Sequence, residues 1–191
     1  MVTTPLPNQN QETIDQFVIF CHGNMAGVRE MLATDPSLIN SRSTLNETPL
    51  GAAAHVGNRA MAEYLLGEGA DPELPASAML GKDDEVRAAV SADPSLANAV
   101  GAHGIPILFH AVIGGNFDLA KYLVEHGADT SPERAGSLLH AAVRAGNVEM
   151  AAWVLSLGAD LNGLDYEQKT PLQRAEESGN AEMIALLLPT A

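Results

Sequence analysis

Glycine recurs along this chain at intervals close to 33 residues, and this period constrains the fold more than any other feature. The marker glycines are Gly23, Gly57, Gly81, Gly115, Gly146 and Gly179, each followed by Asn or, once, by Lys. Successive intervals are 34, 24, 34, 31 and 33 residues, so one repeat is short while the others stay in phase. Such a period is typical of a solenoid of stacked helical hairpins, which presents a binding surface rather than a catalytic pocket.

The composition of the 191-residue chain favours one elongated stack. Hydrophobic residues make up 46% but aromatic residues only 4%, so small aliphatic side chains must fill the space between closely packed helices. The formal net charge of −14 disfavours non-specific binding to nucleic acid or to an anionic membrane. It favours a basic or neutral partner, although an acidic surface also serves solubility alone.

No segment of the sequence predicts export or membrane insertion. The chain has no apolar run of about 18 residues, and residues 1–11 contain neither a basic segment nor an apolar stretch. Cys21 is the single cysteine, which excludes an internal disulfide and is compatible with a reducing compartment. We therefore expect a cytoplasmic protein, with secretion by a non-classical route as the alternative.

An amphipathic helix is predicted after each marker glycine. Counted from the marker, the fifth, sixth, ninth and tenth positions are mostly apolar, as in residues 61–66. Twelve residues after the marker, a second glycine such as Gly69 suits the left-handed residue that ends a helix. In two units this position instead holds Asp35 or Asp93, followed by a proline that prevents the helix from continuing.

A shorter helix is predicted before each marker glycine. Thr48 and Thr170 lie nine residues before a marker and precede Pro-Leu, a pattern in which threonine caps a helix and proline fits its first turn. Each unit therefore contains a short helix, a turn at Gly-Asn, a longer helix and an extended connector. This register places the short helices at residues 13–22, 49–56, 73–80, 107–114, 138–145 and 171–178.

These features resemble the ankyrin repeat, whose pattern is approximately D-x-x-G-x-T-P-L-H-x-A-A-x-x-G-N, a second helix, and then L-L-x-x-G-A-D-x-N. Residues 48–71 and 138–160 match the pattern closely, with His140 at the histidine of the family pattern. The resemblance covers about residues 13–188. It implies an all-α ankyrin-repeat solenoid of about six units, with hairpin fingers and a concave face that binds proteins.

The chain departs from this pattern at several positions. Gly51, Phe109 and Gln173 replace the family histidine, so the hydrogen bonding between Thr and His is weakened in those units. At the turn of the finger, Gly104 keeps the family glycine while Asn46 replaces it, and asparagine tolerates a left-handed backbone better than most residues.

The short repeat is expected to lack a finger. Its missing residues fall between Asp71 and Leu74, where Gly-Ala-Asp runs directly into the next helix, so no finger is predicted between units two and three. We expect this gap to divide the binding edge into a first finger at residues 41–47 and a later group. The later fingers are predicted at residues 99–105, 130–136 and 163–169.

We divide the chain into a disordered leader at residues 1–11, a single ankyrin-repeat domain at residues 12–188 and a tail at residues 189–191. The six units are predicted at residues 12–40, 41–71, 72–98, 99–129, 130–162 and 163–188. In the first unit, residues 17–20 are apolar in succession, which indicates either burial in the stack or a docking patch for another chain. We expect a monomer, with self-association as the alternative.

No pattern in the sequence predicts catalysis, a cofactor or a metal. Cys21 and His22 are adjacent, and adjacent residues on a helix do not face one another. No two histidines are spaced i, i+4 as a helical metal site requires, and no phosphate-binding glycine motif is present. A structural role is predicted for His110 and for His140. We therefore expect a protein that is not an enzyme and that uses no cofactor or metal.

The predicted function is that of a protein-protein interaction module that binds a partner of unknown identity, and neither nucleic acid nor membrane. Candidate contacts on the inner helices are His22, His55, Val56, Met79, Ile113, Arg144 and Glu177. Candidate contacts on the fingers are Arg42, Leu45, His103, Glu133, Arg134, Tyr166 and Gln168. Large or charged residues among these should dominate affinity. The alternative is an acidic inhibitor or immunity-like protein that covers a basic site on a partner enzyme.

Overall fold

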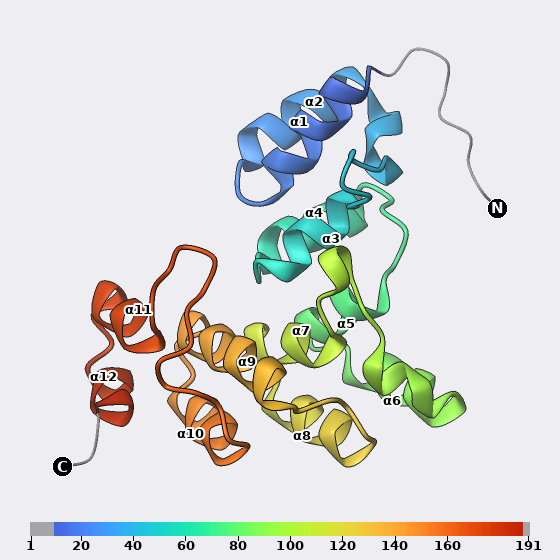
Figure 1. Cartoon of the computed structure of the whole chain (residues 1–191). Coiled ribbons are helices and arrows are strands. Elements are labelled where there is room, and N and C mark those ends of the chain that lie inside the picture. Colours follow the sequence, from blue (N-terminus) through green and yellow to red (C-terminus); the bar gives the residue numbers. More distant parts are fainter. Residues whose placement is uncertain (1–9, 189–191) are drawn as a thin grey trace.

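The computed structural model describes residues 10–188, except for the side chains of residues 132–136. These residues form twelve α-helices arranged as antiparallel pairs, and no strand occurs among them (Figure 1). The inner helices are α1 (Gln11–Cys21), α3 (Pro49–His55), α5 (Leu74–Leu80), α7 (Ile107–Ile113), α9 (Pro132–Arg144) and α11 (Pro171–Ser178). The outer helices are α2 (Met25–Thr34), α4 (Arg59–Gly67), α6 (Asp83–Ala92), α8 (Phe117–Glu125), α10 (Val148–Ser156) and α12 (Ala181–Leu187). This confirms the predicted stack of helical hairpins.

Side-chain caps fix the helix starts as the sequence predicts. The Thr48 side chain accepts a hydrogen bond from the Gly51 amide at the start of α3. Thr170 and Gln173 form a reciprocal capping box at the start of α11. At the outer helices, Asn58 caps α4 through the amide of Met61. Each cap supplies an acceptor to an amide that has no partner inside its own helix.

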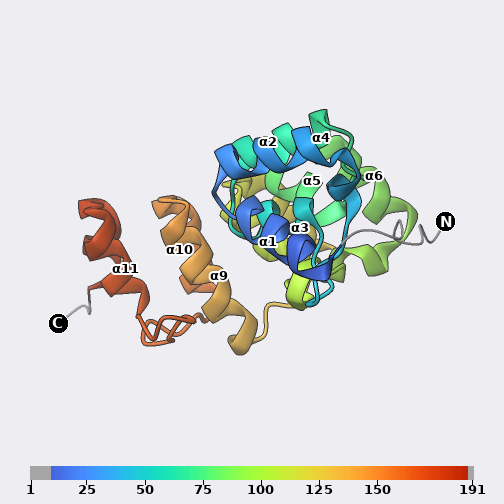
Figure 2. The same cartoon turned by 90° about the horizontal axis from the view of Figure 1, so that it is seen from above.

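The inner helices pack against one another in an unbroken series from α1 to α11. Small residues permit this packing, as in the buried run Ala52 to Ala54 of α3. Most outer helices approach their neighbours less closely than the inner helices do. The stack therefore curves, with the inner helices and the fingers on its concave side (Figures 1 and 2).

The structure differs from the predicted boundaries at two places. Helix α9 begins at Pro132 rather than near residue 138, so the finger predicted at residues 130–136 is replaced by helix. Proline at the first helical position is already in helical geometry, which favours this early start. Helix α1 begins at Gln11 with Asn10 as its cap, so the predicted leader is shorter by these residues. Residues 1–9 and 189–191 lie outside the described part of the chain.

The finger missing from unit three is confirmed, because residues 68–73 connect α4 directly to α5. The predicted division of the binding edge is wrong, however. The finger of the fourth unit, which includes the short 3-10 helix Ala102–Gly104, crosses the gap and contacts α3. Gly51 leaves room for this approach, because a Cβ atom there would lie 3.4 Å from the Ala102 Cβ atom. The fingers of units two and four thus lie together.

The apolar run of the first unit lies mostly inside the stack. Phe17 and Val18 are buried, while Ile19 is exposed. In the described part of the chain, no helix combines the length and the apolar character that a bilayer crossing needs.

Candidate functional site

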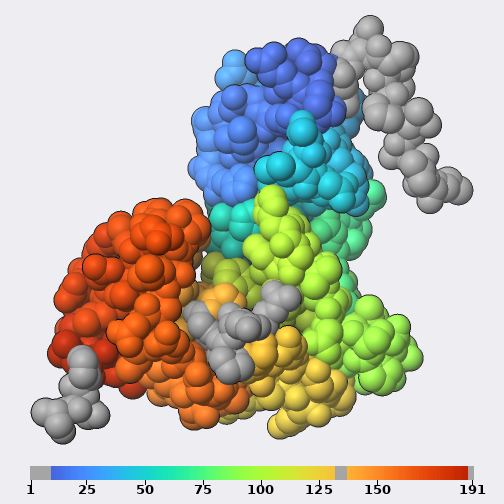
Figure 3. All heavy atoms as spheres, viewed as in Figure 1, coloured from blue at the N-terminus to red at the C-terminus, as the bar shows by residue number. Residues whose placement is uncertain are grey.

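A groove of about 1270 Å³ follows the concave side of the stack. One wall carries His22, which follows α1, His55, which lies at the end of α3, and His103, which lies in the finger of unit four (the fourth finger). The opposite wall carries Tyr166, from the finger of unit six at residues 163–169 (the sixth finger), and Arg174, from α11. In Figure 3 the orange C-terminal surface faces the blue-to-green N-terminal units across this region.

Most of the predicted contact residues lie at this groove. Those that line it are His22, His55, Val56, His103, Ile113, Arg144, Tyr166 and Glu177. Arg42 and Leu45 instead line a smaller hollow of about 570 Å³ between the fingers of units two and four. Gln168 is exposed at the tip of the sixth finger and lines neither hollow. The predicted contacts Glu133 and Arg134 fall in α9, and their side chains lie outside the described residues.

Met79 is the predicted contact that the structure contradicts, because it is completely buried. Its helix, α5, belongs to the unit without a finger and packs against both α3 and α7. The two neighbouring inner helices also contact each other. Met79 therefore serves the core and is not presented to a partner.

Three histidines surround the buried carboxylate of Glu47, and we call these four residues the histidine–glutamate cluster. His55 Nδ1 lies 3.0 Å and His103 Nε2 lies 3.2 Å from Glu47 Oε1. His22 Nε2 lies 3.7 Å from Glu47 Oε2. Potential ligand atoms of His22, Glu47 and His55 all lie within 4.8 Å of one another. Among the described residues, this is the group of histidine and acidic side chains that could hold a metal ion.

The charge of Glu47 is set by two opposing effects. Burial raises the pKa of this carboxyl, but the polar contact with His55 and the charges of the three histidines lower it below its ordinary value. The carboxyl is therefore ionised at neutral pH and places a negative charge in the wall of the groove.

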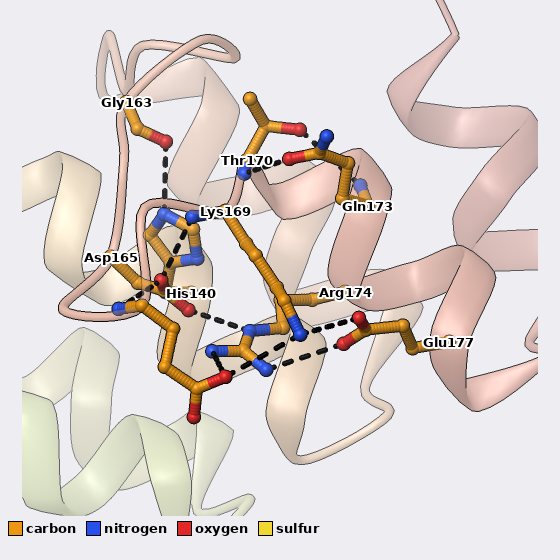
Figure 4. A network of polar contacts seen from close by, with 9 residues as sticks. His140, Gly163, Asp165, Lys169, Thr170, Gln173, Arg174 and Glu177 are labelled. Atoms are coloured by element: carbon orange, nitrogen blue, oxygen red, sulfur yellow. Dashed lines mark hydrogen bonds and ion pairs between the residues drawn. The ribbon is translucent and has the colours of Figure 1, made fainter.

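A second polar network holds the sixth finger against α11 (Figure 4). Asp165 accepts hydrogen bonds from Arg174 Nε at 2.6 Å and from the backbone amides of Glu167 and Lys169. Burial opposes ionisation of Asp165, but these hydrogen bonds and the Arg174 charge lower its pKa to about 2. Lys169 and Arg174 also contact Glu177. This network fixes the position of the finger that carries Tyr166.

The remaining histidines and the cysteine have structural surroundings. His140 Nε2 lies 3.0 Å from the Gly163 carbonyl oxygen and so connects α9 to the sixth finger (Figure 4). His110 is buried and its Nδ1 lies 3.0 Å from the Pro106 carbonyl oxygen. Burial, with a smaller effect from Glu47, raises the pKa of the Cys21 thiol to about 12. The thiol stays protonated at neutral pH and is not a nucleophile.

Comparison with known proteins agrees with this architecture. A family model described as ankyrin repeats in three copies matches residues 74–165 and 108–191, and an ankyrin-repeat model matches residues 45–77. The matches together cover more than half of the chain. The chain belongs to the ankyrin-repeat family. Ankyrin repeats are generally protein-protein interaction modules and are typically not enzymes.

Several larger proteins contain segments similar to this ankyrin stack. The potassium channel AKT1 of Arabidopsis thaliana is 43% identical over 74 residues, which are 38% of this chain and 9% of the channel. Diacylglycerol kinase zeta of Rattus norvegicus is 32% identical over 85 residues, which are 42% of this chain and 9% of the kinase. Alpha-latrocrustotoxin-Lt1a of Latrodectus tredecimguttatus is 25% identical over 162 residues, which are 83% of this chain and 10% of the toxin. The chain thus spans about a tenth of the length of these relatives.

Glu47 is the residue of this ankyrin groove that sequence reasoning missed. It lies in a finger, where an acidic residue is expected to be solvated, yet it is buried. A metal site on one helix shows a regular spacing of its ligands in the sequence, whereas His22, Glu47 and His55 come from different elements. One signal was available, because His22 and His55 each lie close before a marker glycine in successive repeats, and stacking brings such positions together.

Proposed function

We propose that this ankyrin-repeat protein binds a segment of a partner protein in the groove, between the histidine–glutamate cluster and the sixth finger. The observation that carries the proposal is the pair of apolar side chains on the finger wall. Tyr166 is 81% exposed and Leu164 is 56% exposed, and both line the groove. Large apolar side chains at the rim of a concave surface are typical anchors of protein interfaces.

The rigidity of this finger supports the proposal. The carboxylate of Asp165 accepts hydrogen bonds from the finger backbone and from Arg174, so the finger is held before a partner arrives. Arg174 also lies 5.9 Å from the centre of the Tyr166 ring, which limits the positions of that side chain. A preorganised contact surface loses little conformational entropy on binding.

The charge of the groove favours a partner segment that is basic. Asp160, Asp165 and Glu177 line the C-terminal part of the groove, and the whole chain carries a formal charge of −14. The side chains of Lys169 and Arg174 are already engaged by acidic groups of the same finger and helix. If charge attraction dominates the binding free energy, the protein acts as an acidic inhibitor that covers a basic site on an enzyme.

The test is affinity capture from a lysate of the source cells, followed by binding measurements with the captured protein. We expect the double variant Tyr166→Ala/Leu164→Ala, which removes both exposed apolar side chains of the groove, to weaken binding of that protein by at least about tenfold. The matched control is Tyr64→Ala/Leu188→Ala, which removes a tyrosine and an exposed leucine that do not line the groove.

Circular dichroism must show that both double variants keep the helical fold. Equal affinity of the groove variant and the unmodified protein would reject the groove as the binding site. Repetition at high salt separates the two forms of the function. A steep loss of affinity indicates the acidic inhibitor, since surface charge attraction is screened by salt, whereas weak salt dependence indicates apolar anchoring.

A further inference from the structure

The histidine–glutamate cluster brings together side chains from three repeat units. His22 follows α1, Glu47 and His55 belong to the finger and inner helix of unit two, and His103 belongs to the finger of unit four. Non-neighbouring units meet here because the missing finger of unit three lets the fourth finger cross the gap. The cluster therefore does not follow from the regular repeat.

Glu47 has an unusual environment for a carboxylate. Its side chain is only 5% exposed, and Oε1 lies 3.0 Å from His55 Nδ1 and 3.2 Å from His103 Nε2 without a well-aligned hydrogen bond. The Nδ1 atom of His55 is also placed to donate to the Gly51 carbonyl oxygen, at 3.2 Å. A buried carboxylate with only these poorly aligned contacts keeps a negative charge that a bound cation would stabilise.

The spacing of the polar atoms suits a metal of small radius. Zinc binds nitrogen and oxygen ligands at about 2.0–2.2 Å, so neighbouring ligand atoms of a tetrahedral site lie about 3.3 Å apart. His55 Nδ1 and His103 Nε2 lie 3.0 and 3.2 Å from Glu47 Oε1, and His22 Nε2 lies 3.7 Å from Oε2. Ligand atoms of His22, Glu47 and His55 lie within 4.8 Å of one another, so side-chain rotations that shorten these distances would complete three corners of such a site.

The orientation of His22 is that of a metal ligand. Its Nδ1 lies 3.1 Å from the Val18 carbonyl oxygen, which only accepts hydrogen bonds, so Nδ1 carries a proton. Nε2 faces Glu47 at 3.7 Å and becomes available to a metal when the ring is neutral. A metal-bound histidine commonly donates its other N–H to a backbone carbonyl in this way. At His55, binding through Nδ1 would release the proton that lies between this atom and the nearby oxygens.

We propose that His22, Glu47 and His55 bind one divalent transition-metal ion, with His103 as the fourth ligand. Imidazole and carboxylate ligands together suit Zn²⁺ better than Ca²⁺ or Mg²⁺, which prefer oxygen ligands alone. His22 and His103 line the groove, and their side chains are 34% and 39% exposed, so the ion has a path of entry. The bound ion would join units one, two and four.

The test is titration of the EDTA-treated full chain with zinc chloride, followed by isothermal calorimetry and by metal analysis after dialysis. We expect one equivalent of zinc per chain. We also expect the unfolding midpoint to rise by about 5 °C or more when zinc is at a hundredfold excess over its Kd. Cobalt chloride gives a second readout, because the visible spectrum of Co²⁺ reports its coordination geometry.

The variants His22→Gln and Glu47→Gln should each weaken zinc binding by at least about tenfold and remove the rise in the midpoint. His126→Gln is the matched control, because His126 is exposed on the convex side after α8 and lies outside the cluster. His22→Gln changes a partly exposed side chain, so it reports on the site even if Glu47→Gln does not fold. The proposal is overturned if the unmodified chain binds no zinc, or if His22→Gln binds zinc as tightly as His126→Gln does. Neither result bears on partner binding through Tyr166, so this proposal and the proposed function stand or fall separately.

Discussion

The histidine at position 110 illustrates how the fold controls the charge of a single residue. His110 is completely buried, and its Nδ1 lies 3.0 Å from the Pro106 carbonyl oxygen, while no hydrogen-bond partner for Nε2 occurs among the described residues. Burial, together with the charge of His55, lowers the pKa of His110 to about 4, and the hydrogen bond to Pro106 opposes this only in part. The ring is therefore neutral at physiological pH. Protonation of this buried ring would lower the free energy of unfolding.

This depressed pKa predicts a loss of stability on mild acidification. The unfolded chain binds the His110 proton near pH 6.5, whereas the folded chain binds it near pH 4. The stabilisation by the neutral ring is thus fully present above pH 6.5 and is lost as the pH falls toward 4. We expect the free energy of unfolding to fall by about 2 kcal/mol more between pH 7 and pH 4.5 in the unmodified protein than in His110→Gln.

Urea denaturation at several pH values measures this difference. His126→Gln serves as the control, because it removes an exposed histidine and should retain the pH dependence of the unmodified protein. Parallel pH profiles for the unmodified protein and His110→Gln would show that His110 does not titrate differently in the folded and unfolded chains.

Neighbouring inner helices approach so closely that one position between them excludes even a methyl group. Gly114 follows α7, and a Cβ atom there would lie 2.1 Å from the Met79 carbonyl oxygen of α5. We expect Gly114→Ala to push these two helices apart and to lower the free energy of unfolding by about 1–3 kcal/mol. Gly67→Ala is the matched control, because no atom lies within 4 Å of its Cβ position and alanine favours the helix. Thermal unfolding compares the two variants, and an equal effect would rule out the helix contact as the cause.

The sequence predicted the helix starts and turns that depend on interactions between residues close together along the chain. Thr48 and Thr170 cap their helices as expected, because a cap is formed by residues three apart. Asn46 has the predicted left-handed conformation, with φ of 60°. The start of α9 was not predicted, although Ser131 at the N-cap position followed by Pro132 is a local start signal. The repeat period assigned these residues to a finger, and the local signal prevailed over that register.

At the scale of the whole molecule, one absent finger changes which units contact each other. The short repeat was readable from the glycine period, but the crossing of the fourth finger onto unit two was not, because repeats are normally expected to contact only their neighbours. The assembly of the histidine–glutamate cluster results from this crossing. Met79 is buried because α5 packs against α3 and α7, which also contact each other. Predicted contacts such as His22, Arg144 and Glu177 line the groove, since the period fixes their register, and their role in binding stays a prediction.

The contact between units two and four can be broken at Gly51, where the absence of a side chain admits Ala102. The Cβ atom of a leucine at this position would already be in van der Waals contact with the Ala102 Cβ atom, at 3.4 Å, so the rest of the side chain would occupy the space of the fourth finger. The same Cβ atom would lie 2.8 Å from Thr48 Oγ1, so the cap of α3 must shift as well. We expect Gly51→Leu to displace that finger and to expose the amides of Gly101 and Ile107, which donate to carbonyl oxygens within the finger. Hydrogen exchange should therefore accelerate at residues 99–107 while α11 and α12 stay protected.

Gly67→Leu provides the control for this variant, because it adds the same side chain where no atom lies within 4 Å of the Cβ position. It should leave exchange at residues 99–107 unchanged. Faster exchange of Gly51→Leu across all units would show that the fourth finger is not displaced on its own and that the stack unfolds as one cooperative body. Faster exchange at residues 99–107 alone would instead show that the contact between units two and four stabilises only the centre of the stack. Such a local effect is expected because each inner helix keeps its contacts with the neighbouring inner helices when the finger is displaced.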